Sequence, residues 1–400
     1  MTPITRAACV LGLTQVLAFG STYYLTGPLG GRIAADTGWS LGWVMSGSSL
    51  GLLGAGLVAP RIGRIIDRRG GRPVLMASSV LFAAGLVALS LAPTLPLWLA
   101  AWLLIGTGMG SGLYDAAFST LGRLYGRDAR SGITTVTVFG GFASTVCWPL
   151  SAWLGAELGW RGACAVYAVL HLVVALPLYA WLVPALPARP AATPGVAAGE
   201  APAATAPSQA PRDHLTVFLC LAALLTVFAV VPTALLVHLI NLLQGRGMSL
   251  DQAVALGALF GPAQVGARLV EGGLARHYHP IWTMTTAVAL AALGLLLLAA
   301  ATPLAALALA LFGAGNGVYS IARGTLPLSL FGPGQYARLM GRLAMPALLA
   351  QAAAPALSAL AMERFGGDVL LWALVAAAFA SLALVGVLWR VSATLRAGRP

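Results

Sequence analysis

Arg268 and Asp115 are charged residues that each lie inside a long apolar run of this sequence. A charge inside a membrane-length apolar run usually faces a cavity or a partner, and it often marks a path for an ion or a solute. The guanidinium of Arg268 stays charged and presents a planar fork of donors that matches a carboxylate. Asp115 is the only acid well inside such a run, and a desolvated carboxyl group can hold a proton at neutral pH. Arg268 is therefore a candidate for anion binding, and Asp115 is a candidate for proton coupling.

Each of these two residues also has a purely structural interpretation. Arg268 could act as a gate residue by pairing with Glu271 or Asp67. Asp115 is followed two helical turns later by Arg123, so a structural ion pair near the end of the run is its alternative. The sequence leaves both pairs of alternatives open.

Other polar side chains inside the apolar runs are candidates for lining a solute cavity. Each of them alone could equally stabilise the packing of neighbouring helices. These candidates are Tyr23, Tyr24, His238, Asn241, Gln264, Asn316 and Tyr319. Arg323 is expected to extend from its run toward the nearer membrane surface.

The composition indicates that the bilayer is the solvent for most of the surface. Of the 400 residues, 59% are hydrophobic and only 8% are charged, whereas a soluble domain carries about 25% charged residues. The net charge of +12 comes from 23 arginines with no lysine. These arginines gather at the ends of apolar runs without interleaved aromatic residues, so nucleic-acid binding is not expected. The four cysteines lie inside apolar runs without metal-ligand spacing, and we expect neither a metal nor another cofactor.

Twelve apolar runs are long enough to cross a hydrocarbon core of about 30 Å as helices. They lie near residues 7–27, 39–60, 74–92, 95–122, 129–157, 161–183, 214–243, 250–271, 281–300, 303–326, 336–362 and 368–391. The sequence therefore predicts an all-α membrane protein, and tilts or kinks are expected because several runs exceed the bilayer thickness.

Arginine counting gives the expected orientation. With the N-terminus inside the cell, only Arg32, Arg161, Arg246 and Arg364 fall on the outer side, and Arg268 and Arg323 lie within runs. The other 17 of the 23 arginines fall on the inner side. Both termini are therefore expected to be cytoplasmic, in a bacterial-type inner membrane.

A segment poor in apolar residues divides the twelve runs six and six. Residues 184–213 contain seven prolines and no aromatic residue, so we expect an extended linker there. The predicted domains are thus a bundle over 1–183, the cytoplasmic linker 184–213 and a second bundle over 214–400. The two bundles look like repeats, because the pattern Gly108, Gly110, Gly112, Tyr114 returns as Gly313, Gly315, Gly317, Tyr319.

The short arginine-rich turn between the second and third runs carries a family resemblance. It resembles the cytoplasmic signature of the major facilitator superfamily, with Gly71 departing from it at a position that is usually basic. The matching residues are Gly63, Asp67, Arg68, Gly70 and Arg72. The resemblance implies the major facilitator fold, a solute site near the midplane between the two bundles, and a gating role for this turn. Glu271 and Arg323 are further candidates for gating residues. Asp67 itself is expected to pair with the neighbouring arginines or to cap a helix.

A second, narrower resemblance lies in the eighth run. Gln264 and Arg268 resemble the Asp-x-x-x-Arg pattern of monocarboxylate porters, in which the arginine binds the substrate carboxylate. Gln264 replaces the acid of that pattern. The fifth run has Gly140-Gly141 and Trp148-Pro149 in place of the Gly-Pro pair that is common in drug/proton antiporters.

The sequence therefore predicts a monomeric secondary active transporter that works by alternating access. The expected solute is a small organic anion of monocarboxylate type, and protons are the candidate coupling ion in symport. An efflux pump for drugs or toxic compounds is the alternative within transporters. A membrane sensor or an intramembrane enzyme is the alternative from another class, but neither a soluble domain nor a clustered catalytic constellation supports it.

Overall fold

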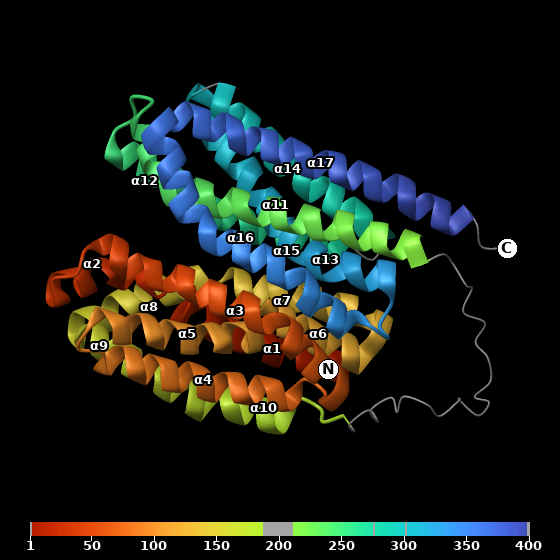
Figure 1. Cartoon of the computed structure of the whole chain (residues 1–400), viewed down its shortest axis with the longest axis horizontal. Helices are drawn as coiled ribbons and strands as arrows, with labels where there is room; N and C mark the ends of the chain where they lie inside the picture. The colour runs from red at the N-terminus through yellow and green to blue at the C-terminus, as the bar shows by residue number, and fades with distance from the viewer. Residues whose placement is uncertain (1, 187–210, 275–276, 301, 398–400) are drawn as a thin grey trace.

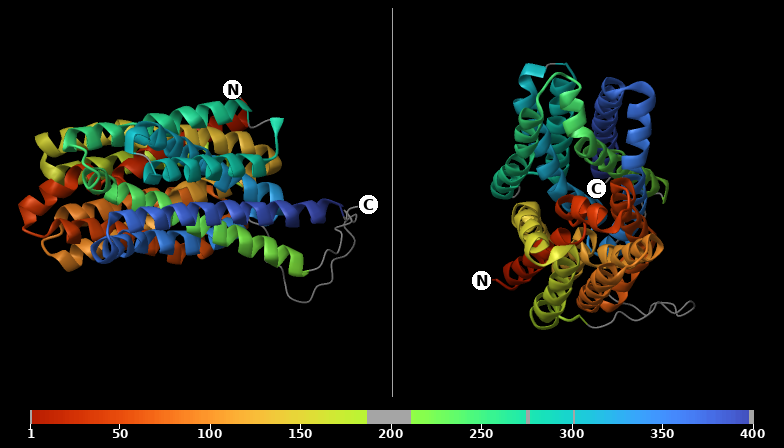
Figure 2. Two further views of the ribbon diagram at one scale, coloured as in Figure 1. Left: turned by 90° about the horizontal axis from the view of Figure 1, so that it is seen from above. Right: turned by 90° about the vertical axis from the view of Figure 1, so that its left-hand side faces the viewer.

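The computed structural model describes residues 2–186, 211–274, 277–300 and 302–397, and this part of the chain contains helices and no strand. The helices form two bundles that lie side by side, one from each half of the sequence (Figure 1). The end-on view in Figure 2 separates the first bundle from the second most clearly. We call the end of the molecule where α1 begins and α17 ends the terminal face, and the opposite end the far face.

The first bundle is built from the helices that precede residue 187. They are α1 (Pro3–Ser21), α2 (Thr26–Thr37), α3 (Leu41–Arg69), α4 (Arg72–Leu91), α5 (Leu95–Gly112), α6 (Tyr114–Tyr125), η1 (Gly126–Asp128), α7 (Ala129–Gly141), α8 (Ala143–Glu157), α9 (Gly159–Leu170), the π-helical turn η2 (His171–Ala175) and α10 (Leu176–Leu182).

The second bundle is built from the helices that follow residue 210. They are α11 (Pro211–Gln244), α12 (Leu250–Ala258), α13 (Phe260–Leu274), α14 (Pro280–Ala300), η4 (Thr302–Leu304), α15 (Ala305–Phe331), α16 (Tyr336–Phe365) and α17 (Gly367–Ala397). Most of the predicted linker, residues 187–210, lies outside the described residues, and α11 already begins at Pro211.

The described helices account for the twelve predicted crossings. Eleven helical stretches are long and apolar enough to cross a membrane, and one of these, Leu95–Glu157, has 63 residues. At 1.5 Å per residue a straight helix of this length would measure about 95 Å, roughly three times the hydrocarbon core. The chain instead reverses at η1, so that α5 and α6 make one crossing while α7 and α8 make the next.

Several predicted runs are broken into two helices rather than being continuous. The first run opens between Ser21 and Thr26, and the fourth, fifth and eighth break at Leu113, Phe142 and Leu259. Two of the breaks precede a proline, since Pro28 and Pro262 lie in the first turns of α2 and α13, whereas Pro232 and Pro355 lie inside continuous helices. Broken helices at membrane depth are tolerated where they line a cavity, and in transporters they often form the solute site.

The two bundles contact each other mainly through α3, α6 and α7 of the first and α13, α15 and α16 of the second. α3 crosses α16 closely because glycines face each other there. A Cβ atom added to Gly341 would lie 2.3 Å from the carbonyl oxygen of Ala59, and one added to Gly63 would lie 2.4 Å from that of Ala337. Side chains at these positions would force the two halves apart.

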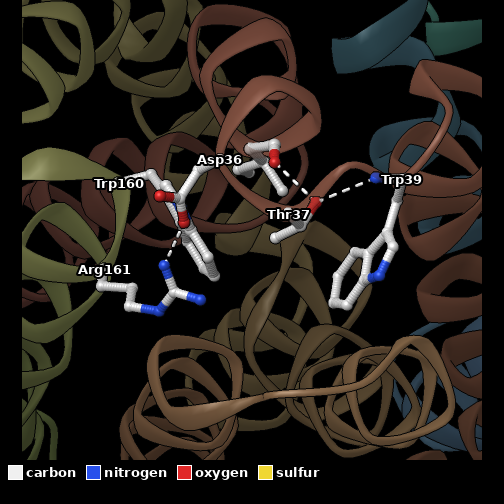
Figure 3. A network of polar contacts seen from close by, with 6 residues as sticks. Asp36, Thr37, Trp39, Trp160 and Arg161 are labelled. Atoms are coloured by element: carbon white, nitrogen blue, oxygen red, sulfur yellow. Dashed lines mark hydrogen bonds and ion pairs between the residues drawn. The ribbon is translucent and has the colours of Figure 1, made fainter.

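Each bundle is also tied together at the far face by an ion pair that joins its first and last crossings. In the first bundle, Asp36 at the end of α2 binds Arg161 and accepts a hydrogen bond of 2.9 Å from the indole of Trp160 (Figure 3). In the second, Arg246 binds Asp368 at 2.7 Å. The acid lies on the first crossing in the first bundle and on the last crossing in the second bundle. Both bundles therefore keep the ion pair, with the two charges exchanged.

Candidate functional site between the two bundles

A cavity of about 160 Å³ lies between the bundles, where broken helices of the first bundle meet α13, α15 and α16 of the second. Its wall combines aromatic, amide and charged side chains. Those that bear on its chemistry are Phe19, Tyr23, Tyr24, Tyr114, Asp115, Gln264, Arg268, Asn316, Tyr319, Arg323 and Gln351. Five of the seven predicted lining residues, together with Arg268 and both members of an ion pair, therefore meet at one place.

Arg268 is buried in this wall, with only 4% of its surface exposed. Its Nε atom donates to the carbonyl oxygen of Gly317 at 3.3 Å, and its Nη1 atom donates across the halves to that of Thr137 at 3.0 Å. Both acceptors are backbone carbonyls, and no carboxylate among the described residues forms an ion pair with Arg268. The expected gate pairing of Arg268 with Glu271 or Asp67 is therefore not found.

Glu271 lies one turn beyond Arg268 but belongs to a separate network. It accepts hydrogen bonds from Thr283 at 2.8 Å and from the phenol of Tyr278. Burial raises the pKa of Tyr278, and the hydrogen bond to Glu271 raises it further, so Tyr278 stays protonated as the donor. Arg130 completes the network across the two halves, because its Nη1 atom donates to the carbonyl oxygen of Tyr278 at 2.8 Å.

Asp115 lies at the first turn of α6 and forms an ion pair with Arg323 of α15 at 2.6 Å. This corrects two expectations. Asp115 does not pair with Arg123, whose Nε atom instead donates to the backbone oxygen of Asp67 at 3.3 Å. Arg323 does not extend to the membrane surface, because the carboxylate of Asp115 holds its side chain in the cavity wall.

The aromatic and amide residues form the remainder of the wall. The amide of Gln351 in α16 lies 3.5 Å from the hydroxyl of Tyr23 and donates to Thr233 at 3.0 Å. Phe19 packs against Tyr114 with ring centroids 4.6 Å apart. Phe19, Tyr114 and Gln351 were not predicted as lining residues. Gln351 was detectable as an amide inside an apolar run, but an aromatic lining residue looks like any other core residue.

Two predicted lining residues lie elsewhere. His238 is buried against α16, where its Nε2 atom is 3.0 Å from the hydroxyl of Ser358. Asn241 is exposed one turn further along α11. Neither contributes to the cavity wall, because the helical period carries both side chains away from the interface between the bundles.

The arginine-rich turn closes the terminal face beside α16. Asp67 pairs with Arg338 of the second half at 2.6 Å, rather than with the neighbouring arginines or with a helix end. Gly70 adopts a φ of 81° and ends α3 by donating to the oxygen of Ile66. Arg68 is exposed and Arg72 is half-buried, and neither forms an ion pair within the described part of the chain.

The site contains no arrangement typical of a metal centre. Among the described residues, no group of three or more His, Cys, Asp or Glu side chains could hold a metal ion.

Comparison with known proteins identifies related sequences and folds. Residues 11–341 match the profile of the family described as Major Facilitator Superfamily. No curated protein sequence matches the chain. The fold is similar to that of the human organic anion transporter MFSD10 (TETRAN), with a TM-score of 0.75, 20% identity, and coverage of 96% of this chain and 100% of that one.

Two further solved transporters share the fold. The proton:xylose symporter XylE, bound to 6-bromo-6-deoxy-D-glucose, aligns with a TM-score of 0.72 and 12% identity over 95% of this chain and 94% of its own. FucP in the outward conformation aligns with a TM-score of 0.71 and 12% identity over 96% of this chain and 99% of its own.

Proposed function

The chain belongs to the major facilitator superfamily, and from that premise we propose that this transporter moves a small organic anion of monocarboxylate type by alternating access. Membership of this family makes the protein a multi-pass membrane transporter rather than an enzyme.

The uncompensated charge of Arg268 is the observation that carries the anion assignment. The cavity wall contains two arginines and one aspartate, and the pairing of Arg323 with Asp115 leaves the Arg268 charge unbalanced. An uncompensated buried charge is costly, so an anionic solute in the cavity would be favoured. A carboxylate suits a guanidinium because the two groups are planar and form charge-assisted hydrogen bonds.

The size of the cavity supports a small solute. Pockets for drug-sized ligands typically measure about 300–1,000 Å³, whereas this cavity measures about 160 Å³. The aromatic rings of Phe19, Tyr23 and Tyr24 provide an apolar surface for the body of the solute. These features favour a compact organic acid over the bulky cations typical of drug efflux, which remains the alternative.

Protons are the proposed coupling ion, and Asp115 is the group that would bind them. The carboxylate of Asp115 holds Arg323 across the interface between the bundles. Protonation of Asp115 would remove the charge that attracts Arg323, and the solute's own carboxylate could then bind the released guanidinium. Such an exchange would link proton uptake to anion uptake, as symport requires.

The conformation in the structure fits one end of an alternating-access cycle. The cross-bundle ion pair Asp67–Arg338 and the hydrogen bond from Arg130 to Tyr278 lie toward the terminal face. Among the described residues, no comparable contact joins α2 or α8 to α12 at the far face. We infer that the terminal face is closed here and that it faces the cytoplasm of a bacterial-type cell, as the arginine distribution favours. A monomer suffices for this cycle, because both halves of the site come from one chain.

A thermal-shift screen of the purified full-length protein tests the substrate class. A ligand that binds only the folded state raises the melting temperature according to its concentration and affinity. We expect small monocarboxylates to stabilise the protein, with neutral amides of the same acids as matched controls. Stabilisation by cationic drugs alone would overturn the anion assignment and support the efflux alternative.

A further inference from the structure

A second, larger cavity of about 590 Å³ opens between α7 and α13, on the side of the molecule away from α3 and α16. Its polar wall is formed by the first turns of α7 and the residues just before it, namely Arg127, Asp128, Arg130, Ser131, Thr134 and Thr135, together with Arg268 of α13, which lines both cavities. Val138, Phe139 and Leu269 form its apolar wall toward the middle of the bundle. The pocket therefore has a polar end near the terminal face and an apolar end at membrane depth.

The polar end carries donors that have no partner. The Nε and Nη2 atoms of Arg130 are buried, and neither has a hydrogen-bond partner among the described residues. Only its Nη1 atom is engaged, by the carbonyl oxygen of Tyr278. A buried charged donor without an acceptor is costly, so an anion close to Arg130 would be favoured. Arg127 at the rim and Arg268 on α13 add two further positive charges, against the single acid Asp128.

The apolar end opens toward lipid rather than water. Leu269 in the pocket wall is 55% exposed, and its neighbour Val270 is 63% exposed. Both lie on α13. Together, α12 and α13 form a stretch that is long and apolar enough to cross the membrane. An occupant with an anionic head and an acyl chain satisfies both ends of the pocket at once.

We propose that this pocket binds an anionic glycerophospholipid from the leaflet at the terminal face. The phosphodiester would pair with the guanidinium of Arg130, with Arg127 close to the headgroup. One acyl chain would lie along Leu269, Val138 and Phe139. Because α7 and α13 belong to different bundles, a lipid seated between them bridges the two halves at the closed face.

Native mass spectrometry of the full-length protein, with phosphatidylglycerol or phosphatidylcholine added, tests this site. We expect the wild type to retain a phosphatidylglycerol molecule. Arg130→Gln should bind this lipid at least about tenfold more weakly, because it loses one charge-assisted contact. Since Arg130 also holds Tyr278, a second variant leaves that contact intact. Ser131→Glu places a repelling charge at the rim and should weaken binding similarly, whereas Ser131→Gln should not.

Arg364→Gln, which removes an exposed charge near the far end of α16, is the matched control and should bind the lipid as the wild type does. Wild-type retention of phosphatidylglycerol by both Arg130→Gln and Ser131→Glu would overturn the proposal. Equal retention of phosphatidylcholine would also overturn it, because the headgroup charge would then be irrelevant. Binding of glycerol 3-phosphate as tightly as the lipid would identify a soluble-anion pocket instead.

Discussion

The Nη2 atom of Arg323 lies 2.6 Å from the Oδ1 atom of Asp115, and this ion pair joins the two bundles at the wall of the central cavity. The two residues come from α6 and α15, which are far apart in sequence and occupy equivalent crossings of the two repeats. The pair balances one of the two cavity arginines, and it places a titratable group where a change of charge would affect both halves.

Asp115→Asn is expected to abolish solute accumulation driven by a pH gradient while leaving solute exchange largely intact. The amide keeps the size of the side chain but removes the proton-binding charge, and exchange needs no net protonation cycle. Accumulation and exchange can be measured in the same proteoliposomes, with Asp251→Asn at an exposed site outside both cavities as control. Accumulation that persists in Asp115→Asn would place the coupling elsewhere.

The Asp67–Arg338 pair is expected to act as one unit in gating. Asp67 is buried while Arg338 is half exposed, and they meet across the two halves at 2.6 Å. Asp67→Asn and Arg338→Gln should each slow solute flux at equal expression, and the double variant should be no slower than either single one, as a double-mutant cycle requires of coupled residues. Arg68→Gln, at an exposed position in the same turn, should leave flux unchanged. Strictly additive losses would show that the two residues act independently.

The close crossing of α3 and α16 should tolerate no added side chain. Gly341→Ala would place a methyl group 2.3 Å from the carbonyl oxygen of Ala59, and overpacking of this kind typically costs about 1–3 kcal/mol. We expect a lower melting temperature and greater labelling of cysteines introduced at the terminal face. Gly334→Ala is the matched control because open space surrounds that position. An unchanged melting temperature in Gly341→Ala would mean that the halves are not tightly packed there.

The architecture could be predicted from the sequence because the bilayer imposes it. Apolar length sets the number of crossings, and the signature around Gly63 and Asp67 together with the glycine repeats indicated the family and the two bundles. The breaks at Leu113 and Phe142 directly follow Gly112 and Gly141, but they could not be predicted, since other glycines in the same runs lie inside continuous helices. They depend on tertiary contacts around the cavity.

The candidate site was predicted residue by residue but not pair by pair. Asp115 and Arg268 stood out as charged residues in apolar runs, and both line the central cavity, whereas Arg323 was expected at the membrane surface and lines the cavity as well. Asp115 and Arg323 come from opposite halves of the chain, so spacing along the sequence suggested the local partner Arg123 for Asp115 and missed the distant one. The prediction that His238 lines the cavity was wrong for a related reason. A polar residue in an apolar run does not reveal which side of the helix faces the other bundle.

Arg268 supports the central claim that this transporter binds an anion, and calorimetry tests that claim most directly. The measurement is the dissociation constant of the organic acid that stabilises the wild type most, determined for the wild type and for Arg268→Lys. Lysine keeps the positive charge but loses the planar fork, so binding should weaken by about 1.5–3 kcal/mol, which corresponds to roughly 10- to 150-fold. An unchanged dissociation constant, with increased labelling of cysteines at the terminal face, would make Arg268 a gate residue and contradict the assignment of an anionic solute.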